Sequence, residues 1–168
     1  MTGTNATDED QDLRKKFDFN KHRYANDMPI SQQREKILDL VGGNQIVVIS
    51  GATGCGKSTQ VPQYILDNHA IGKKPVNIIV TQPRKLAASS IARRVCEERN
   101  WNLGGLVGYQ VGLDKVYKGP DTRLLYVTTG VLKKMILERT QQIYPPLLLL
   151  LTKRNVKKEK SKEQLAEF

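Results

Sequence analysis

Cysteine and histidine are scarce in this chain. Its 168 residues include two cysteines, Cys55 and Cys96, and two histidines, His22 and His69. No C-x-x-C pair or comparable metal-ligand spacing occurs among them, which excludes a structural zinc site and a disulfide framework. The sequence therefore predicts a reducing compartment.

Long apolar runs are also missing. The longest is the run of five leucines from Leu147 to Leu151, whereas a helix that crosses a membrane needs about 20 apolar residues. Met1 is followed by a polar, acidic segment and not by the basic and apolar regions of a secretory signal. These features predict a protein of the cytoplasm or nucleus that has no membrane partner.

Acidic residues are fewer than basic ones. The chain has 17 Asp and Glu against 27 Lys and Arg, a formal net charge of +10 and an isoelectric point of about 9.7. Residues 1–12 hold four acidic and no basic side chains, so the remaining chain is still more basic. Such a charge favours a polyanionic partner such as nucleic acid, although a well-solvated surface would have the same composition.

Short apolar runs alternate with amphipathic segments through most of the chain. The runs at 46–50, 76–81, 107–111 and 124–128 are typical of strands, and helices are expected at 32–41, 57–68, 85–100 and 131–139. Ser31 is expected as the N-cap of the first helix. Strands that alternate with helices predict an α/β fold with a parallel sheet covered on both faces.

The two ends of the chain do not share this alternation. Residues 1–23 are expected to be disordered or weakly ordered, and residues 24–140 to form the α/β domain. Residues 141–168 are interpreted as a divergent, Leu-rich and then charged tail, in which the leucines begin either a strand or a helix.

The segment from Gly51 to Ser58, Gly-Ala-Thr-Gly-Cys-Gly-Lys-Ser, matches the phosphate-loop pattern GxxxxGK[ST]. It lies between an expected strand and an expected helix, where backbone N–H groups can turn toward phosphate oxygens. Lys57 is expected to bridge the β- and γ-phosphates, and Ser58 to place its hydroxyl on Mg²⁺. Cys55 is interpreted as a small residue tolerated in the loop, not as a catalytic thiol.

A second basic segment, Thr81 to Ala88, reads Thr-Gln-Pro-Arg-Lys-Leu-Ala-Ala and follows the second expected strand. Ligands of open α/β folds bind at the carboxyl ends of the strands. Arg84 and Lys85 stand there at a helix start, where cations oppose the helix dipole. An anionic partner such as a phosphate backbone explains them better than a helix start alone.

Four segments together resemble a known family. GATGCGKSTQVPQYILD, TQPRKLAASSIARRV, LGGLVGYQVG and RLLYVTTGVL are similar to motifs I and Ia, the intervening Gly-Tyr segment and motif Ib of DEAH-box ATP-dependent RNA helicases, in the same order. The similarity is greatest to the tudor-domain-containing helicases of the spindle-E type. It implies an incomplete P-loop NTPase fold, part of a first RecA-like domain.

The resemblance also implies roles for individual residues. Those that would bind ATP and Mg²⁺, with Lys57 as the catalytic one and Arg94 against the adenine, are Gly51, Ala52, Thr53, Gly54, Cys55, Gly56, Lys57, Ser58, Thr59 and Arg94. Those that would touch the RNA backbone are Pro83, Arg84, Lys85, Thr128, Thr129 and Gly130. For helicases of this type the resemblance implies ATP-driven RNA remodelling with piRNA-pathway proteins as partners, transposon silencing, and cytoplasmic germ granules.

One family motif has no counterpart. In the family an Asp-Glu-x-His strand end follows motif Ib by about twenty residues and supplies the acidic pair for Mg²⁺ and water. Here the chain reads Tyr144-Pro145-Pro146, then the leucines, then Thr152-Lys153-Arg154-Asn155. The sequence therefore predicts a truncated or divergent helicase domain that does not hydrolyse ATP alone. A small P-loop kinase and a nucleotide-gated RNA-binding decoy without turnover are the alternatives.

Overall fold

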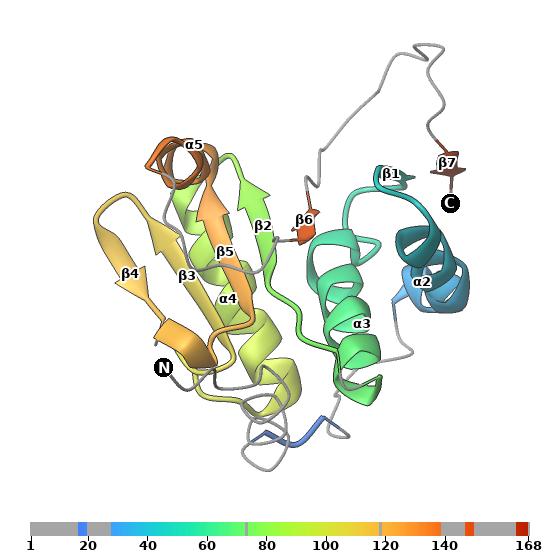
Figure 1. The fold of residues 1–168 in the computed structure, drawn as a ribbon, viewed down its shortest axis with the longest axis horizontal. Coiled ribbons are helices and arrows are strands. Elements are labelled where there is room, and N and C mark those ends of the chain that lie inside the picture. Colours follow the sequence, from blue (N-terminus) through green and yellow to red (C-terminus); the bar gives the residue numbers. More distant parts are fainter. Residues whose placement is uncertain are drawn as a thin grey trace, which may run out of the picture.

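The computed structural model describes residues 17–19, 28–72, 74–117, 119–138, 147–149 and 164–167, in which helices and strands alternate (Figure 1). The elements are η1 Pro29–Gln33, α2 Arg34–Gly43, β1 Val47–Ser50, α3 Lys57–Ile71, β2 Ile78–Gln82, α4 Lys85–Arg99, β3 Val107–Val111, β4 Asp114–Val116, η2 Gly119–Asp121, β5 Leu124–Thr128, α5 Thr129–Leu137, β6 Leu147–Leu149 and β7 Gln164–Glu167. No helix of these ranges is long and apolar enough to cross a membrane.

A five-stranded sheet in the order β4-β3-β5-β2-β6 forms the centre of the fold. β2 pairs in parallel with both β5 and β6, and β3 pairs in parallel with β5. Only β4, at one edge, is antiparallel. The predicted α/β fold with a mainly parallel sheet is confirmed.

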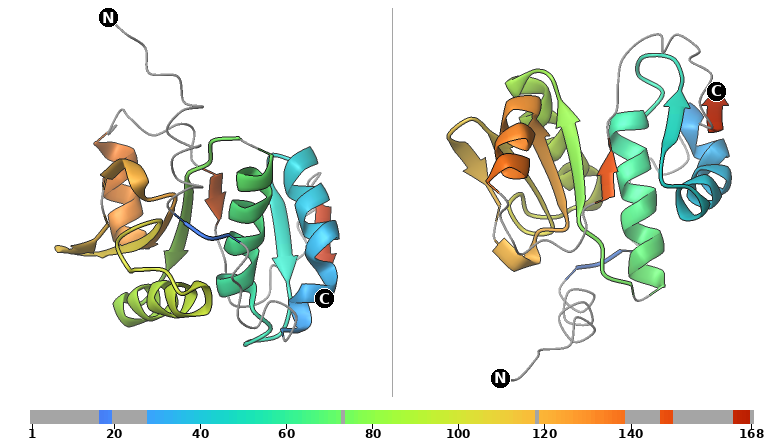
Figure 2. Two further views of the ribbon diagram at one scale, coloured as in Figure 1. Left: turned by 90° about the horizontal axis from the view of Figure 1, so that it is seen from below. Right: turned by 45° about the horizontal axis from the view of Figure 1, so that its top comes forward.

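Helices cover both faces of this sheet, as predicted (Figure 2). Successive residues of a strand point to opposite faces. Ile78 and Tyr126 accordingly pack in the larger core with α3 and α4, whereas Ile79 and Val127 pack with Val131 of α5 on the other face. The strands of the sheet centre are therefore apolar on both sides.

Among the described residues β1 lies outside this sheet, although the sequence predicts a single sheet. It pairs in parallel with β7 in a separate two-stranded sheet. The leucine strand β6 lies between β2 and the β1–β7 pair (Figures 1 and 2). The leucines therefore extend the sheet beyond β2, and Gln164–Glu167 of the expected charged tail form the partner strand of β1.

Some expected boundaries are wrong. Ser31 lies inside η1 and is not an N-cap, because the 3₁₀ turn begins at Pro29, whose fixed φ suits a first helical position. α5 begins at Thr129, so Gly130 lies within the helix instead of before it. The short strand β4, which follows a turn with Gly112 at φ 67°, has no counterpart among the expected elements.

The segment Phe17 to Phe19 packs against the domain. The Phe17 and Phe19 rings meet the Trp101 ring edge-on, with centroid distances of 6.1 and 5.4 Å. Trp101 Nε1 donates to the Asp18 carbonyl at 3.2 Å, and Arg99 Nη1 donates to the Phe19 carbonyl at 3.2 Å. Trp101 thus joins a segment for which the sequence indicated little structure to the end of α4.

Trp101→Ala is expected to lower the free energy of unfolding by about 3–5 kcal/mol, the usual range for a large buried aromatic side chain. Trp101 is only 9% exposed, and the change removes both ring contacts and the N–H donor. Leu113→Ala is the control, because Leu113 is fully exposed and should leave stability unchanged. Urea denaturation followed by circular dichroism measures both, and equal stabilities would contradict the packing described.

Candidate functional site

The loop between β1 and α3 depends on two glycines in left-handed conformations. Gly54 has φ 87° and Gly56 has φ 101°, values that side chains rarely adopt. A Cβ on Gly56 would also lie 3.0 Å from both Gln60 Cγ and Ile30 Cγ2. Gly56 is therefore required by backbone conformation and by the packing directly beside it.

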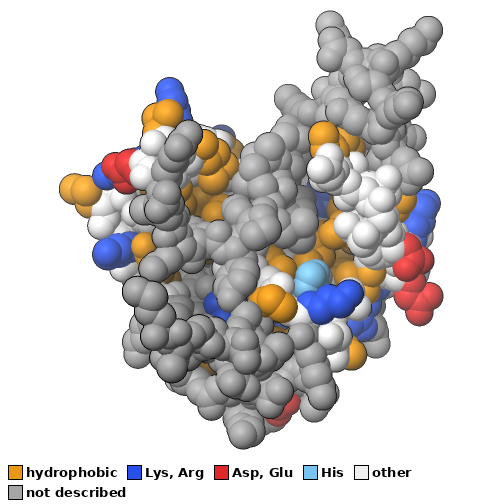
Figure 3. Space-filling model, in the orientation of Figure 1, with side chains coloured by type: hydrophobic (Ala, Val, Ile, Leu, Met, Phe, Trp, Pro, Cys, Tyr) orange, Lys and Arg blue, Asp and Glu red, His pale blue; other side chains and the backbone are white. Residues whose placement is uncertain are grey.

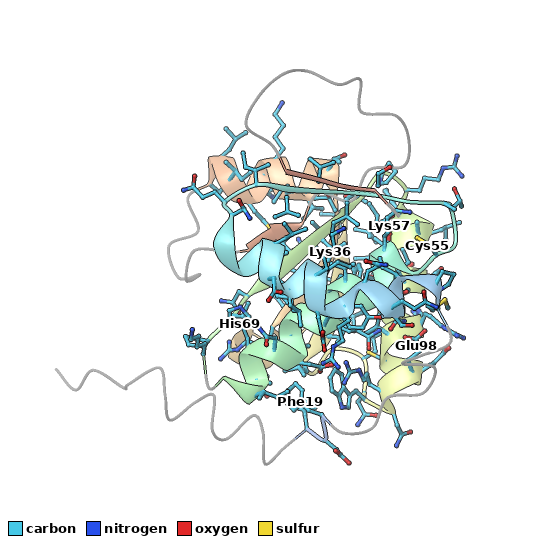
Figure 4. All side chains as sticks on the ribbon, turned by 90° about the vertical axis from the view of Figure 1, so that its right-hand side faces the viewer. Phe19, Lys36, Cys55, Lys57, His69 and Glu98 are labelled. Carbon is cyan, nitrogen blue, oxygen red and sulfur yellow. The ribbon has the colours of Figure 1, made fainter. Side chains whose placement is uncertain are left out.

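The Lys57 ammonium lies over this loop. Its Nζ donates to the carbonyls of Gly51 at 2.6 Å and Ala52 at 2.8 Å, and lies 3.3 Å from Cys55 Sγ (Figure 4). These contacts place a positive charge where the loop glycines turn. A phosphate that enters the loop would offer this ammonium a charged acceptor in place of neutral carbonyls.

A hydrogen bond from the sheet holds the first turn of α3 in place. Tyr126, fully buried on β5, donates its hydroxyl to the Ser58 carbonyl at 3.0 Å. Burial, with the nearby Glu98 carboxylate, raises the pKa of Tyr126 well above its usual value of 10. The phenol therefore remains a donor at neutral pH, and α3 is tied to β5 next to the phosphate loop.

A cavity of about 750 Å³ joins the two sequence segments that were predicted to bind anions, and its size is typical of ligand pockets. It lies where the phosphate loop meets the carboxyl end of β2 and the start of α5. Its lining residues are Met28, Thr53, Gly54, Gly56, Lys57, Ser58, Thr59, Thr81, Gln82, Pro83, Arg84, Ala87 and Thr129.

Several predicted site residues lie outside this lining: Gly51, Ala52, Cys55, Lys85, Arg94, Thr128 and Gly130. The Lys85 ammonium lies beside the β3–β4 turn, 3.6 Å from where a Gly112 Cβ would be. Arg94 Nε donates to Glu98 Oε1 at 2.9 Å, and the Arg94 side chain is 46% exposed. The roles predicted for these residues stay predictions.

Four lining residues were not among the predicted ones: Met28, Thr81, Gln82 and Ala87. Thr81 and Gln82 are buried at the carboxyl end of β2, and the Gln82 amide nitrogen has no hydrogen-bond partner within the described ranges. Their place just before Pro83 could have identified them, since ligands collect at that sheet edge. Met28 could not be found this way, because it reaches the cavity only through the packing of η1.

The metal expected at Ser58 finds few protein ligands here. No Asp or Glu occurs among the cavity's lining residues, and the described ranges contain no cluster of three or more metal-ligating side chains. Mg²⁺ is commonly bound by one or two carboxylates together with substrate phosphates and water. The Ser58 hydroxyl fits as one ligand, with phosphates and water as the others.

A second cavity of about 520 Å³ lies between α2 and the end of α3. Its walls are mainly apolar, with His69 and Lys74 among them, and both hydrophobic and cationic side chains lie beside the pale blue histidine in Figure 3. Burial, with a smaller contribution from Lys74, lowers the pKa of His69. The imidazole is therefore neutral at pH 7, and this cavity is less suited to anions than the first.

Comparison with known proteins finds relatives but no matching family model. Over 110 residues, 66% of this chain, it is 56% identical to ATP-dependent RNA helicase TDRD9 of Mus musculus. Probable ATP-dependent RNA helicase spindle-E is 54% identical in Culex quinquefasciatus over 78% of this chain and 49% identical in Drosophila yakuba over 83%. The matched segments are 8%, 9% and 10% of these relatives' lengths. The helicase resemblance of the four sequence segments is confirmed.

Proposed function

Because the chain is homologous to a segment of the ATP-dependent RNA helicases of the TDRD9 and spindle-E type, we propose that it is the ATP-binding and RNA-binding part of such a helicase. The observation that carries the proposal is the shared cavity, in which Lys57 and Ser58 of the phosphate loop and Arg84 of the second basic segment lie together. Such a cavity can hold a nucleotide phosphate and an RNA phosphate close to each other.

ATP binding follows from the loop geometry. The glycine turns and the N-terminus of α3 direct backbone N–H groups and a positive dipole end to one place. Lys57 adds a charge that is now shared between two carbonyls and would move onto the β- and γ-phosphates. Ser58 would contribute its hydroxyl to Mg²⁺, and Arg94, exposed on α4, would lie against the adenine.

Lys57→Ala is expected to raise the dissociation constant for ATP and Mg²⁺ about tenfold or more, because it removes a charge-assisted hydrogen bond to phosphate. Lys36→Ala is the matched control, since it deletes the same charge from an exposed position on α2 outside the cavity lining. A titration with a fluorescent ATP analogue measures both. Equal affinities for the two variants would remove the phosphate-loop assignment.

RNA binding follows from the neighbouring strand ends. Gln82 of β2 pairs with Thr128 of β5, so the residues just after these strands share one sheet edge. Arg84 and Thr129 are exposed there and line the cavity. The Thr129 hydroxyl, the Arg84 guanidinium and the start of α5 can contact phosphate and sugar groups. Such contacts do not distinguish one base sequence from another.

Arg84→Ala is expected to weaken the binding of unrelated single-stranded RNAs to a similar degree. Loss of one phosphate contact should make the slope of log K against log salt shallower by about 0.7. Lys133→Ala, exposed on α5 outside the cavity lining, is the charge-matched control. Fluorescence anisotropy over a salt series tests this, and a sequence-selective or salt-independent interaction would contradict backbone binding.

The chain alone is further proposed to bind ATP without useful hydrolysis. Phosphoryl transfer requires a positioned water and charge neutralisation at the γ-phosphate, and no carboxylate lines the described cavity. A phosphate-release assay with and without RNA should give background rates for wild type and for Lys57→Ala alike. RNA-stimulated turnover that disappears in Lys57→Ala would refute this part of the proposal.

The cellular role rests on the sequence resemblance. For the protein that carries this segment we propose the piRNA pathway, transposon silencing and cytoplasmic germ granules, with the nucleus as the alternative location. Sequencing the small RNAs that co-purify with the protein from gonads tests this, and an absence of piRNAs would count against it.

A further inference from the structure

Glu98 is a buried carboxylate that faces α3 from α4 (Figure 4). The residue is only 2% exposed. Its Oε1 accepts a hydrogen bond from Arg94 Nε, and its Oε2 accepts one from each side-chain amide of Gln60 and Gln63, all at 2.9 Å. A charge buried to this degree is tolerated only when it is paired and hydrogen-bonded, which these three donors achieve.

The two glutamines belong to the helix that follows the phosphate loop. Gln60 and Gln63 are fully buried and stand three residues apart, on one face of α3. Both amide groups point to the same oxygen of Glu98. Because hydrogen bonds are strong in a low-dielectric interior, this arrangement fixes the orientation of both amides and the rotation of α3 about its axis.

Gln60 also touches the loop itself. Its backbone N–H donates to the Gly56 carbonyl at 2.7 Å, and its Cγ is one of the two atoms that would lie 3.0 Å from a Cβ on Gly56. The Gln60 side chain therefore packs against the turn that ends the loop. Any rotation of this side chain would change the space available to Gly56.

We infer that Glu98 is a positioning residue for the phosphate loop: by holding Gln60 it fixes the turn at Gly56, and with it the direction of the loop N–H groups and of Lys57. The inference rests on the proposed nucleotide binding. Two other roles for Glu98 make different predictions. A carboxylate that merely joins α3 to α4 affects stability alone, and one that acts through space repels phosphate, so its removal would increase affinity.

Glu98→Gln keeps the side-chain shape but removes the charge and replaces one acceptor oxygen by a donor. At least one of the three donors then loses its partner, and the buried amides of Gln60 and Gln63 lose their charged acceptor. The dissociation constant for a fluorescent ATP analogue with Mg²⁺ is expected to rise about tenfold. The titration uses the full 168-residue chain well below its melting temperature. Gln60→Leu, which replaces the carboxamide on Cγ by two methyl groups, is the second variant and should weaken binding in the same direction.

Asp67→Asn is the matched control. Asp67 Oδ2 accepts from Arg99 Nη2 at 2.6 Å, so this ion pair joins the same two helices through buried groups, but near the end of α3 that lies away from the loop. The control should lower the melting temperature and leave nucleotide affinity unchanged.

The outcomes separate the ideas. The positioning role would be overturned if Glu98→Gln and Gln60→Leu bound the ATP analogue as tightly as wild type. It would also be overturned if Glu98→Gln bound the analogue more tightly, or if Asp67→Asn lost as much affinity as Glu98→Gln. If Glu98→Gln does not fold, Gln60→Leu decides alone. A wild-type chain that binds no nucleotide would overturn the proposed function itself, which is seen before any variant is compared.

Discussion

The need to satisfy charges buried between α3 and α4 constrains much of this structure. Glu98 accepts hydrogen bonds from Arg94 on α4 and from two glutamines on α3. Arg99 donates hydrogen bonds to Gln63, Asp67 and the Phe19 carbonyl. Unpaired, either charge would strongly destabilise the domain, so the two helices have little freedom to slide or rotate. The same contacts fix two more distant parts: the phosphate loop at the start of α3 and the aromatic segment at residues 17–19.

The contacts between α3 and α4 are important for the position of the phosphate loop, because β1 lies outside the five-stranded sheet in the described part of the chain. In many α/β folds the strand before a phosphate loop is held by ladder hydrogen bonds to its neighbours, whereas here β1 pairs with β7 and not with the sheet that contains β2. Within the described ranges, the loop is positioned relative to Pro83 and Arg84 mainly through α3. The Tyr126 contact with Ser58 joins this helix to β5, and the contacts of Glu98 and Arg99 join it to α4.

Local features were predictable, and pairings between distant segments were not. The bounds of β3 and β5 match the expected ones, because each is a short apolar run between turn residues, and α3 and α4 begin at the expected lysines. The sequence could not predict that β6 pairs with β2 or that β1 lies outside the five-stranded sheet. The apolar residues of a strand do not specify which strand it pairs with. Glu98 and Gln60 were not identified either, because polar residues on a helix pattern resemble a solvated face until their partners are known.

The charge at the cavity depends on local pairing more than on the net +10 of the chain. Lys57, Arg84 and the N-terminus of α3 make the cavity positive, and no carboxylate is among its lining residues. The negative charge of Glu98 could reduce this positive potential, since Glu98 accepts a hydrogen bond from Gln60 beside the loop. Arg94 and two amide donors offset its charge, so a carboxylate can brace the phosphate loop while the cavity remains attractive to phosphate. The basic excess elsewhere would bring a polyanion to the molecule, but these pairings decide where on it the phosphate can bind.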